Sequence, residues 1–230
     1  MMSIGVVIPA AGQGSRMNSQ TNKQYLGLAD RPVLAHTIAL FSDNPQIKEI
    51  IVVVRQEEIK YCREKVINKY FNNKKIRIIA GGETRRESVF AGLRVFSPAI
   101  NYVIIHDGAR PILPVSVVER VILTVKENDA VSVGVKPKNT IKRVDGKGYV
   151  LETLDRGELV SIQTPQAFSR ELIMKAHQEV ASDLKVTDDA ALVEFLGYQV
   201  KVISGSEENI KITTPEDMFI AESILENRRR

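Results

Sequence analysis

The stretch from Ile4 to Met17, IGVVIPAAGQGSRM, decides the fold class of this chain. Its first six residues are mostly apolar, as in a strand that is covered on both faces of a parallel sheet. The residues that follow are small, and Gly12 and Gly14 let backbone amides approach a phosphate closely. Ligands of open α/β sheets bind beyond the carboxyl ends of the strands. The stretch therefore predicts an α/β fold with a phosphate-binding loop after its first strand.

The rest of the chain alternates between apolar β-type runs and segments with helical spacing. Strands are expected at residues 4–9, 49–54, 76–80, 102–106, 130–135 and 199–204. One intervening segment spaces its apolar residues by 3, 4 and 4 positions, at Ile59, Cys62, Val66 and Tyr70. That spacing is typical of one face of a helix. The alternation predicts a Rossmann-like, doubly wound α/β fold with a mainly parallel sheet.

Residues 136–159, KPKNTIKRVDGKGYVLETLDRGEL, interrupt this alternation. Two short β-type runs, TIKRV and YVLETL, flank a Gly-rich turn and contain too few large apolar residues for a core of their own. We therefore expect a β-hairpin arm that projects from one domain spanning residues 1–230. Such an arm either packs on another copy of the chain or stays a solvated hairpin. The first interpretation predicts a homodimer with a dimerisation arm at about 136–159.

Composition places the chain among ordinary globular proteins. Its 230 residues are 43% hydrophobic and 26% charged, and no apolar run approaches the ~20 residues that cross a bilayer. The single cysteine, Cys62, has no internal disulfide partner, so a cytoplasmic location is expected, with Cys62 as buried apolar filler. The net charge of +4 falls to +1 without the C-terminal arginines 228–230, and only 6% of residues are aromatic. Neither a nucleic-acid partner nor a membrane is therefore expected.

Spacing distinguishes between kinds of phosphate-binding loop. A P-loop requires GxxxxGK[ST], and Met17 stands where the second Gly would be. A dinucleotide loop requires GxGxxG, and Met17 again replaces the final Gly. The second strand also ends about 40 residues further on, rather than the ~20 expected for a ribose-binding acid. Both of these loops are disfavoured.

A third kind of loop carries two cations just beyond the glycines, here Arg16 and Lys23. A guanidinium presents a fixed fork to phosphate oxygens and an ammonium presents a compact point charge. The pair suits a triphosphate whose charge redistributes during displacement. The order AAGxGxRM, then a short spacer, KQ and a Leu, resembles the nucleotide loop of the sugar-phosphate nucleotidylyltransferases. This resemblance implies the fold of the nucleotide-diphospho-sugar transferases.

Five further motifs narrow the resemblance. They are GGETRRESV (81–89), HDGARP (106–111), DRGELVSIQTPQAF (155–168), VTDDAAL (186–192) and NIKITTPEDM (209–218). In this order, over residues 4–222, the chain closely resembles the 2-C-methyl-D-erythritol 4-phosphate cytidylyltransferases of the non-mevalonate isoprenoid pathway. The resemblance implies transfer of the cytidylyl group of CTP to methylerythritol phosphate, with Mg²⁺ or another divalent cation as cofactor. It also implies a homodimer in which the arm crosses to the partner subunit.

The roles of the family's residues carry over to matching positions of this sequence. Positions around the cytosine and ribose are Ala10, Ala11, Gly12, Gly82, Glu83 and Ser88. Positions that stabilise the attacked α-phosphate are Arg16 and Lys23. Positions around the methylerythritol phosphate are Asp107, Arg110, Thr140, Arg156, Thr187 and Lys211. Further substrate contacts are implied for Pro9, Gly14, Arg85 and Ala109, and the catalytic cations are Arg16, Lys23, Arg156 and Lys211.

The implied chemistry requires no strong general base, because the attacking phosphate oxygen is already ionised. It requires cations and Mg²⁺ to oppose the repulsion between two anions. Most Mg²⁺ ligands can come from the triphosphate itself. Asp107 is the carboxylate best placed to meet the metal or substrate hydroxyls, or else it braces its own loop. His106 is expected to brace the same loop, with no catalytic role.

The chain departs from the family's pattern in small ways. Val160 stands where a Trp is common, and Glu83 occupies a position often filled by Asp. Arg86, beside Arg85, is expected to be a solvated helix residue.

Two other functions remain open at this point. Ribitol 5-phosphate cytidylyltransferases typically carry AGG and HDAVRP where this chain has AAG (10–12) and HDGARP (106–111). A noncatalytic nucleotide-binding protein of the same fold would be expected to lose Arg16 or Lys23, and both are present.

Overall fold

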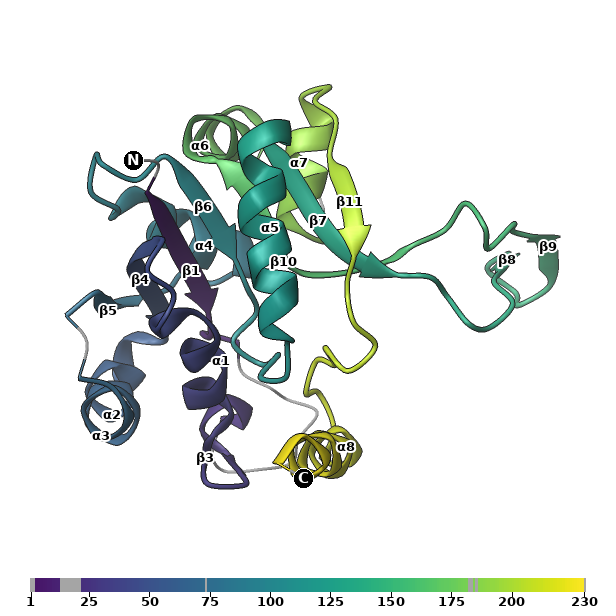
Figure 1. The fold of residues 1–230 in the computed structure, drawn as a ribbon. Coiled ribbons are helices and arrows are strands. Elements are labelled where there is room, and N and C mark those ends of the chain that lie inside the picture. The colour runs from purple at the N-terminus through teal and green to yellow at the C-terminus, as the bar shows by residue number, and fades with distance from the viewer. Residues whose placement is uncertain (1–2, 13–21, 73, 182–183, 185, 230) are drawn as a thin grey trace.

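A computed structural model of the chain describes residues 3–12, 22–72, 74–181, 184 and 186–229. Within these residues the main sheet has seven strands (Figure 1). Their spatial order is β11 (Lys201–Ser204), β7 (Ala130–Val135), β10 (Ser161–Ser169), β6 (Tyr102–Ile105), β1 (Ile4–Pro9), β4 (Ile47–Val54) and β5 (Ile76–Ala80). All neighbouring strands pair in parallel except β10, which runs antiparallel to both β6 and β7. The predicted doubly wound, mainly parallel sheet is confirmed.

Strand β10 was not expected as a strand. Its sequence, SIQTPQAFS, contains Gln163, Thr164 and Gln166, which break the apolar run that marks the other strands. These three side chains are nevertheless buried. Each has a hydrogen-bond partner in the folded chain, for example the amide of Gln163 on the carbonyl of Ser206 at 2.9 Å. Burial of a polar side chain is tolerated only with such partners, and they come from distant segments.

Helices cover both faces of the sheet (Figure 1). On β1, Ile4, Val6 and Ile8 belong to one core cluster and Val7 to another on the opposite face. The first cluster also contains residues of α1 (Val33–Ser42), α2 (Ile59–Cys62) and α5 (Val115–Asn128). The second contains residues of α4 (Arg85–Arg94), α6 (Arg170–Glu179) and α7 (Asp189–Phe195).

The helix expected around Cys62 is present but is not continuous. A π-helical turn, η4 (Arg63–Ile67), separates α2 from α3 (Asn68–Tyr70). Cys62 is fully buried, as expected. Two 3₁₀ turns, η2 (Lys23–Tyr25) and η3 (Gln56–Glu58), precede α1 and α2. The C-terminal helix α8 (Pro215–Arg229) packs near the small hairpin β2 (Gly27–Leu28) and β3 (Arg31–Pro32).

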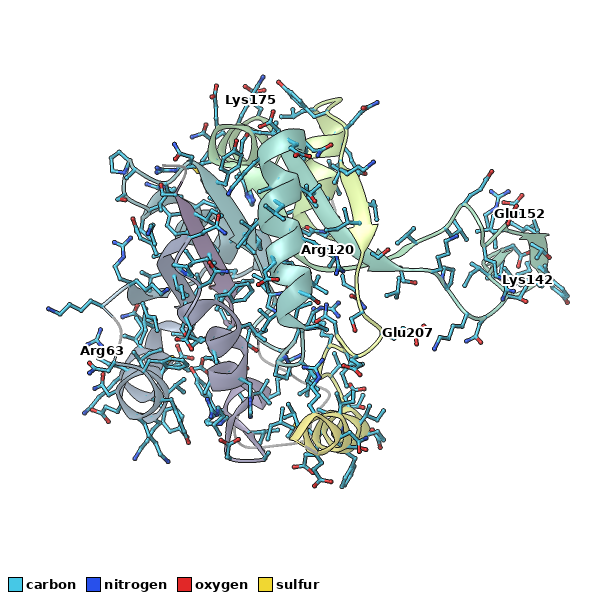
Figure 2. The ribbon with its side chains drawn as sticks, viewed as in Figure 1. Arg63, Arg120, Lys142, Glu152, Lys175 and Glu207 are labelled. Carbon is cyan, nitrogen blue, oxygen red and sulfur yellow. The ribbon has the colours of Figure 1, made fainter. Side chains whose placement is uncertain are left out.

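The hairpin arm projects away from the main sheet, as predicted (Figure 1). It consists of β8 (Lys142–Val144) and β9 (Val150–Thr153), which form a separate antiparallel pair. Asp145 shapes the turn by accepting hydrogen bonds from the backbone amides of Lys147 and Tyr149, both at 2.9 Å. Every residue of β8 and β9 is exposed. Figure 2 shows Lys142 and Glu152 at the far end of the arm and Glu207 beside its base.

In the described part of the chain, no helix combines the length and the apolar character needed to span a lipid bilayer.

Two leucines on helices test how much of the stability comes from the layered core. Leu93 of α4 is fully buried against the sheet, whereas Leu123 of α5 is 62% exposed. Replacing Leu93 with Ala should lower the free energy of unfolding by about 2–5 kcal/mol, because a cavity remains in a packed interior. Leu123→Ala should change it by less than about 0.5 kcal/mol. Urea denaturation of the purified variants measures both values, and equal losses would contradict the assignment of these helix faces.

Candidate active site

A cleft lies at the carboxyl ends of β1, β5 and β6. The lining residues come from five separate segments: 9–12, 23–24, 82–85 with Ser88, 107–109 and Lys211. The cleft therefore forms where parallel strands end together, which is the location expected for an open α/β sheet.

The floor of the cleft is a tightly held backbone. The amide of Ala10 donates to the carbonyl of Val53 at 2.7 Å, and the amide of Gly108 donates to the carbonyl of Pro9 at 3.1 Å. A Cβ at Gly108 would lie 3.0 Å from the Cβ of Ala10, so a side chain there would push the two loops apart by a few tenths of an ångström. At Gly12 an added Cβ would meet no described atom within 4 Å. Packing against the described residues therefore does not require a glycine at that position.

The N-terminus of α4 forms one wall. Thr84 accepts a hydrogen bond from the amide of Glu87, and the Glu87 carboxylate accepts from the amides of Glu83 (2.7 Å) and Thr84 (3.2 Å). This capping box fixes the start of the helix. Ser88 accepts a hydrogen bond from the amide of Gly82 at 3.2 Å. The wall thus presents small residues and a helix N-terminus, an arrangement that favours anions.

A buried carboxylate, Asp107, lies near three cations: Arg85 and Lys211, which line the cleft, and Arg110. Its Oδ1 lies 3.1 Å from Arg85 Nε, and its Oδ2 lies 2.8 Å from Lys211 Nζ and 3.8 Å from Arg110 Nε. Its backbone amide donates to the hydroxyl of Thr164 at 3.0 Å. Burial opposes ionisation, but Arg85 and Lys211 outweigh it and hold the pKa of Asp107 well below its usual range.

A second buried carboxylate, Asp189, holds Arg85 from the other side. Its Oδ2 lies 2.7 Å from Arg85 NH1, and its Oδ1 lies 3.3 Å from His177 Nε2. Burial would raise the pKa of Asp189, but Arg85 and His177 lower it further than burial raises it. Three cations, Arg85, Arg110 and Lys211, thus face two carboxylates. The surplus positive charge suits an anionic ligand.

The structure brings most of the predicted site residues together. The cleft is lined by Pro9, Ala10, Ala11, Gly12, Lys23, Gly82, Glu83, Arg85, Ser88, Asp107, Ala109 and Lys211. Arg110 lies outside this cleft and lines a neighbouring one, to which Lys211 also contributes. Gly14 and Arg16 lie outside the described residues.

Three predicted residues lie away from the cleft. Thr140 and Arg156 belong to the arm segment, where Arg156 NH1 donates to the carbonyl of Lys138 at 2.6 Å. Thr187 is exposed in the turn that precedes α7. None of the three lines the cleft within the described chain.

Sequence reasoning missed two contributors. Gln24 is buried and donates from Nε2 to the carbonyl of Ala10 at 2.8 Å, so it holds the floor. Asp189 had no assigned role, although Gln24 and Asp189 both lie inside motifs that the sequence analysis quoted.

The expectation that Arg86 is solvated was wrong. Arg86 NH1 donates to the carbonyl of Ala181 at 2.7 Å, and NH2 reaches carbonyls at the C-terminal end of α6.

The side chains around the cleft indicate how Mg²⁺ could be bound there. Both oxygens of Asp107 are paired with cations, and the described residues contain no group of three or more His, Cys, Asp or Glu side chains that could hold a metal. Mg²⁺ commonly takes few protein ligands and shares substrate phosphates. The cleft therefore fits a metal that arrives with a polyphosphate rather than one held by an all-protein cage.

Comparison with known proteins gives one consistent result. The family model described as IspD: 2-C-methyl-D-erythritol 4-phosphate cytidylyltransferase matches residues 4–227. A protein of that name from Syntrophotalea carbinolica is 48% identical, over 98% of this chain and 97% of its own. Another, from Caldanaerobacter subterraneus subsp. tengcongensis, is 45% identical, over 97% of this chain and 99% of its own.

Comparison with solved structures supports the same family. A 4-diphosphocytidyl-2C-methyl-D-erythritol synthase from Anaerococcus prevotii superposes with a TM-score of 0.87 at 37% identity, covering 98% of this chain and 96% of that one. A 2-C-methyl-D-erythritol 4-phosphate cytidylyltransferase from Francisella tularensis gives a TM-score of 0.81 at 32% identity, covering 96% and 99%. The similarity extends over nearly the whole chain.

The stability of the folded chain should depend on pH through His106, which lies at the end of β6 beside the cleft loop. This histidine is fully buried, its Nε2 lies 3.0 Å from the carbonyl of Arg110, and burial lowers its pKa to about 4. Between pH 6.5 and 4 the unfolded chain binds a proton at this residue that the folded chain does not, so stability falls as pH falls. From pH 7.5 to 5 the loss attributable to His106 should be about 2 kcal/mol. Urea denaturation at the two pH values measures it. The pH dependence should shrink by that amount in His106→Gln, and an unchanged dependence would contradict the assignment.

Proposed function

Because the chain belongs to the 2-C-methyl-D-erythritol 4-phosphate cytidylyltransferase family, we propose that it transfers the cytidylyl group of CTP to 2-C-methyl-D-erythritol 4-phosphate. The products are 4-diphosphocytidyl-2-C-methyl-D-erythritol and diphosphate. The observation that carries this proposal is the cleft itself, where a wall of small residues meets Lys23, Arg85 and Lys211. Such a combination suits two phosphate-bearing substrates that must approach each other.

The reaction is an in-line displacement. A phosphate oxygen of the methylerythritol phosphate attacks the α-phosphorus of CTP, and the bond from that phosphorus to the β-phosphate oxygen breaks. The nucleophile is ionised at neutral pH, so no side chain has to remove a proton. His106, which is buried and does not line the cleft, has no part in proton transfer. The work of the protein is to hold two anions together and stabilise the charge that develops.

The nucleotide occupies the part of the cleft formed by residues 9–12 and the start of α4. The small side chains of Ala10, Ala11 and Gly82 leave space for a pyrimidine and let backbone amides approach it. Glu83 faces the ribose. Lys23 lines the cleft next to the floor residue Gln24, and with Arg16 it stabilises the α-phosphate as it is attacked. Mg²⁺ would be held mainly by the CTP phosphates rather than by the protein, and it would offset part of their negative charge.

The second substrate binds on the Asp107 side. Lys211 takes part in both the main cleft and the neighbouring one, which Arg110 also lines. The ion pairs with Asp107 hold Arg85 and Lys211 in fixed positions without fully neutralising the cluster. A preorganised cluster of this kind binds a phosphate with little loss of side-chain entropy. Asp107 acts mainly as the organiser of these cations, and its remaining acceptor capacity can meet substrate hydroxyls.

The protein acts as a homodimer in the cytoplasm. The arm carries exposed apolar residues, namely Val144, Tyr149, Val150 and Leu151, each more than half exposed. Exposed apolar groups on a projecting hairpin favour packing against a second copy. In that assembly Thr140 and Arg156 of one subunit complete the site of the other, which accounts for their distance from the cleft of their own chain. The buried, unpaired Cys62 fits a reducing compartment.

The direct test is an assay of purified protein with CTP, Mg²⁺ and methylerythritol phosphate, measuring diphosphate release. We expect turnover with this substrate and at least about tenfold lower kcat/KM with ribitol 5-phosphate, a difference of about 1.4 kcal/mol in transition-state binding. Faster turnover with ribitol 5-phosphate would reassign the substrate. Binding of CTP without any turnover would instead support a noncatalytic nucleotide-binding protein.

Mixed dimers test the role of the arm. A heterodimer of one Arg156→Ala subunit and one Lys23→Ala subunit contains one site with both native residues if the arm serves the neighbour. It should then show about half the activity of the wild-type dimer, because sites of a dimer count separately. Each homodimeric variant should be much less active. Heterodimers of proven composition that recover no activity would show that Arg156 serves its own chain.

A further inference from the structure

We propose that Glu58 is a positioning residue for Lys23: its carboxylate clamps the turn that presents this lysine to the cleft. The inference rests on the proposed function, because it assigns Glu58 a role in the turnover that Lys23 supports. Glu58 ends the 3₁₀ turn η3, which follows β4, and it does not line the cleft itself.

Three side chains of the lysine-bearing turn donate hydrogen bonds to this single carboxylate. Asn22 donates from Nδ2 to Oε1 of Glu58. Gln24 donates from Nε2 and Tyr25 from its hydroxyl to Oε2, at 3.3 and 3.2 Å. One carboxylate, 33 to 36 positions further along the chain, therefore holds Asn22 and Gln24, which flank Lys23, and Tyr25.

The clamp is continuous with the floor of the cleft. The same Nε2 of Gln24 that reaches Glu58 also donates to the carbonyl of Ala10 at 2.8 Å. Tyr25 packs edge-on against Tyr61, with ring centroids 5.0 Å apart. Burial raises the pKa of Tyr25, and Cys62 and Glu58 add to that shift, so its hydroxyl keeps the proton that it donates. The segment from Glu58 to Cys62 thus forms a cradle for the turn.

A carboxylate is the side chain that fits this position. It accepts hydrogen bonds at both oxygens and donates none, which matches three incoming donors. A glutamine would turn an NH₂ group toward at least one of those donors. The turn itself is short: the amides of Tyr25 and Leu26 donate back to the carbonyls of Asn22 (2.9 Å) and Lys23 (3.2 Å), and the Glu58 carboxylate joins its side chains from outside.

The decisive experiment compares Glu58→Ala and Glu58→Gln with the wild type in steady-state assays at varied CTP concentration, with enough enzyme that slow rates remain measurable. In Glu58→Ala, kcat should fall about 10- to 100-fold while the KM for CTP changes less than about threefold, because a misplaced catalytic group mainly affects the transition state. Glu58→Gln should recover part of the loss. Glu57→Ala is the matched control, since Glu57 is exposed and pairs with Arg55; it should match the wild type.

Two further readouts separate positioning of Lys23 from a general loss of structure. In a Lys23→Ala background, Glu58→Ala should cause no additional loss of rate, because residues that act as one unit are non-additive. Hydrogen exchange of the Tyr25 and Leu26 amides should quicken in Glu58→Ala, while β1 and β4 stay protected.

Each of these readouts can overturn the inference. Unchanged kcat in Glu58→Ala, an equal fractional loss in the Lys23→Ala background, or unchanged exchange of the turn amides would each reject it. A wild-type protein that releases no diphosphate would reject the proposed function instead.

Discussion

Asp107 is a buried carboxylate that remains ionised only because cations from three separate segments surround it. Arg85 comes from the first turn of α4, Arg110 from the loop after β6 and Lys211 from the loop after β11. An unpaired charge in this position would be costly, so the fold must bring these segments together. The chain does so by returning from both edges of the sheet: α4, which follows the edge strand β5, packs on β1, and in the segment after the edge strand β11 the amide of Ile212 donates to the carbonyl of Ala109 at 2.8 Å. The cleft is the space that this convergence leaves.

The need to pair buried charges also applies to the residues behind the cleft. Arg85 cannot serve Asp107 in a fixed geometry unless its other end is held, and Asp189 at the start of α7 holds it. The N-terminus of α7 is in turn fixed by Gln166 of β10, whose side-chain oxygen accepts from the amides of Asp189 (3.1 Å) and Ala190 (3.2 Å). The antiparallel strand β10 therefore belongs to the site as much as to the sheet. A network of this kind is strong when every member is satisfied and fails when one is removed.

Local patterns in the sequence carry some of this information. The strands at 4–9, 76–80 and 130–135 have the predicted bounds, since each is an apolar run of the usual strand length. The residues of the first loop, and those after the third and fourth strands, could be placed at one cleft because carboxyl ends of parallel strands share an edge. The polar strand β10 could not be predicted, because partners distant in sequence decide whether a buried Gln or Thr is satisfied. The π-helical turn at Arg63 could not be predicted either, because the apolar spacing around Cys62 is that of an ordinary helix.

By itself, the sequence determined the fold class, the family and the set of cationic loops, because short-range spacing of apolar, small and basic residues encodes strands, helices and phosphate loops. The tertiary structure alone decided which of these groups touch. It paired Asp107 with Arg85 and Lys211, placed Asp189 and Gln24 behind them, and set Glu58 against the turn of Lys23. Hydrogen bonds and ion pairs act over about 3 Å between groups far apart in the chain, and no local pattern specifies such a distance.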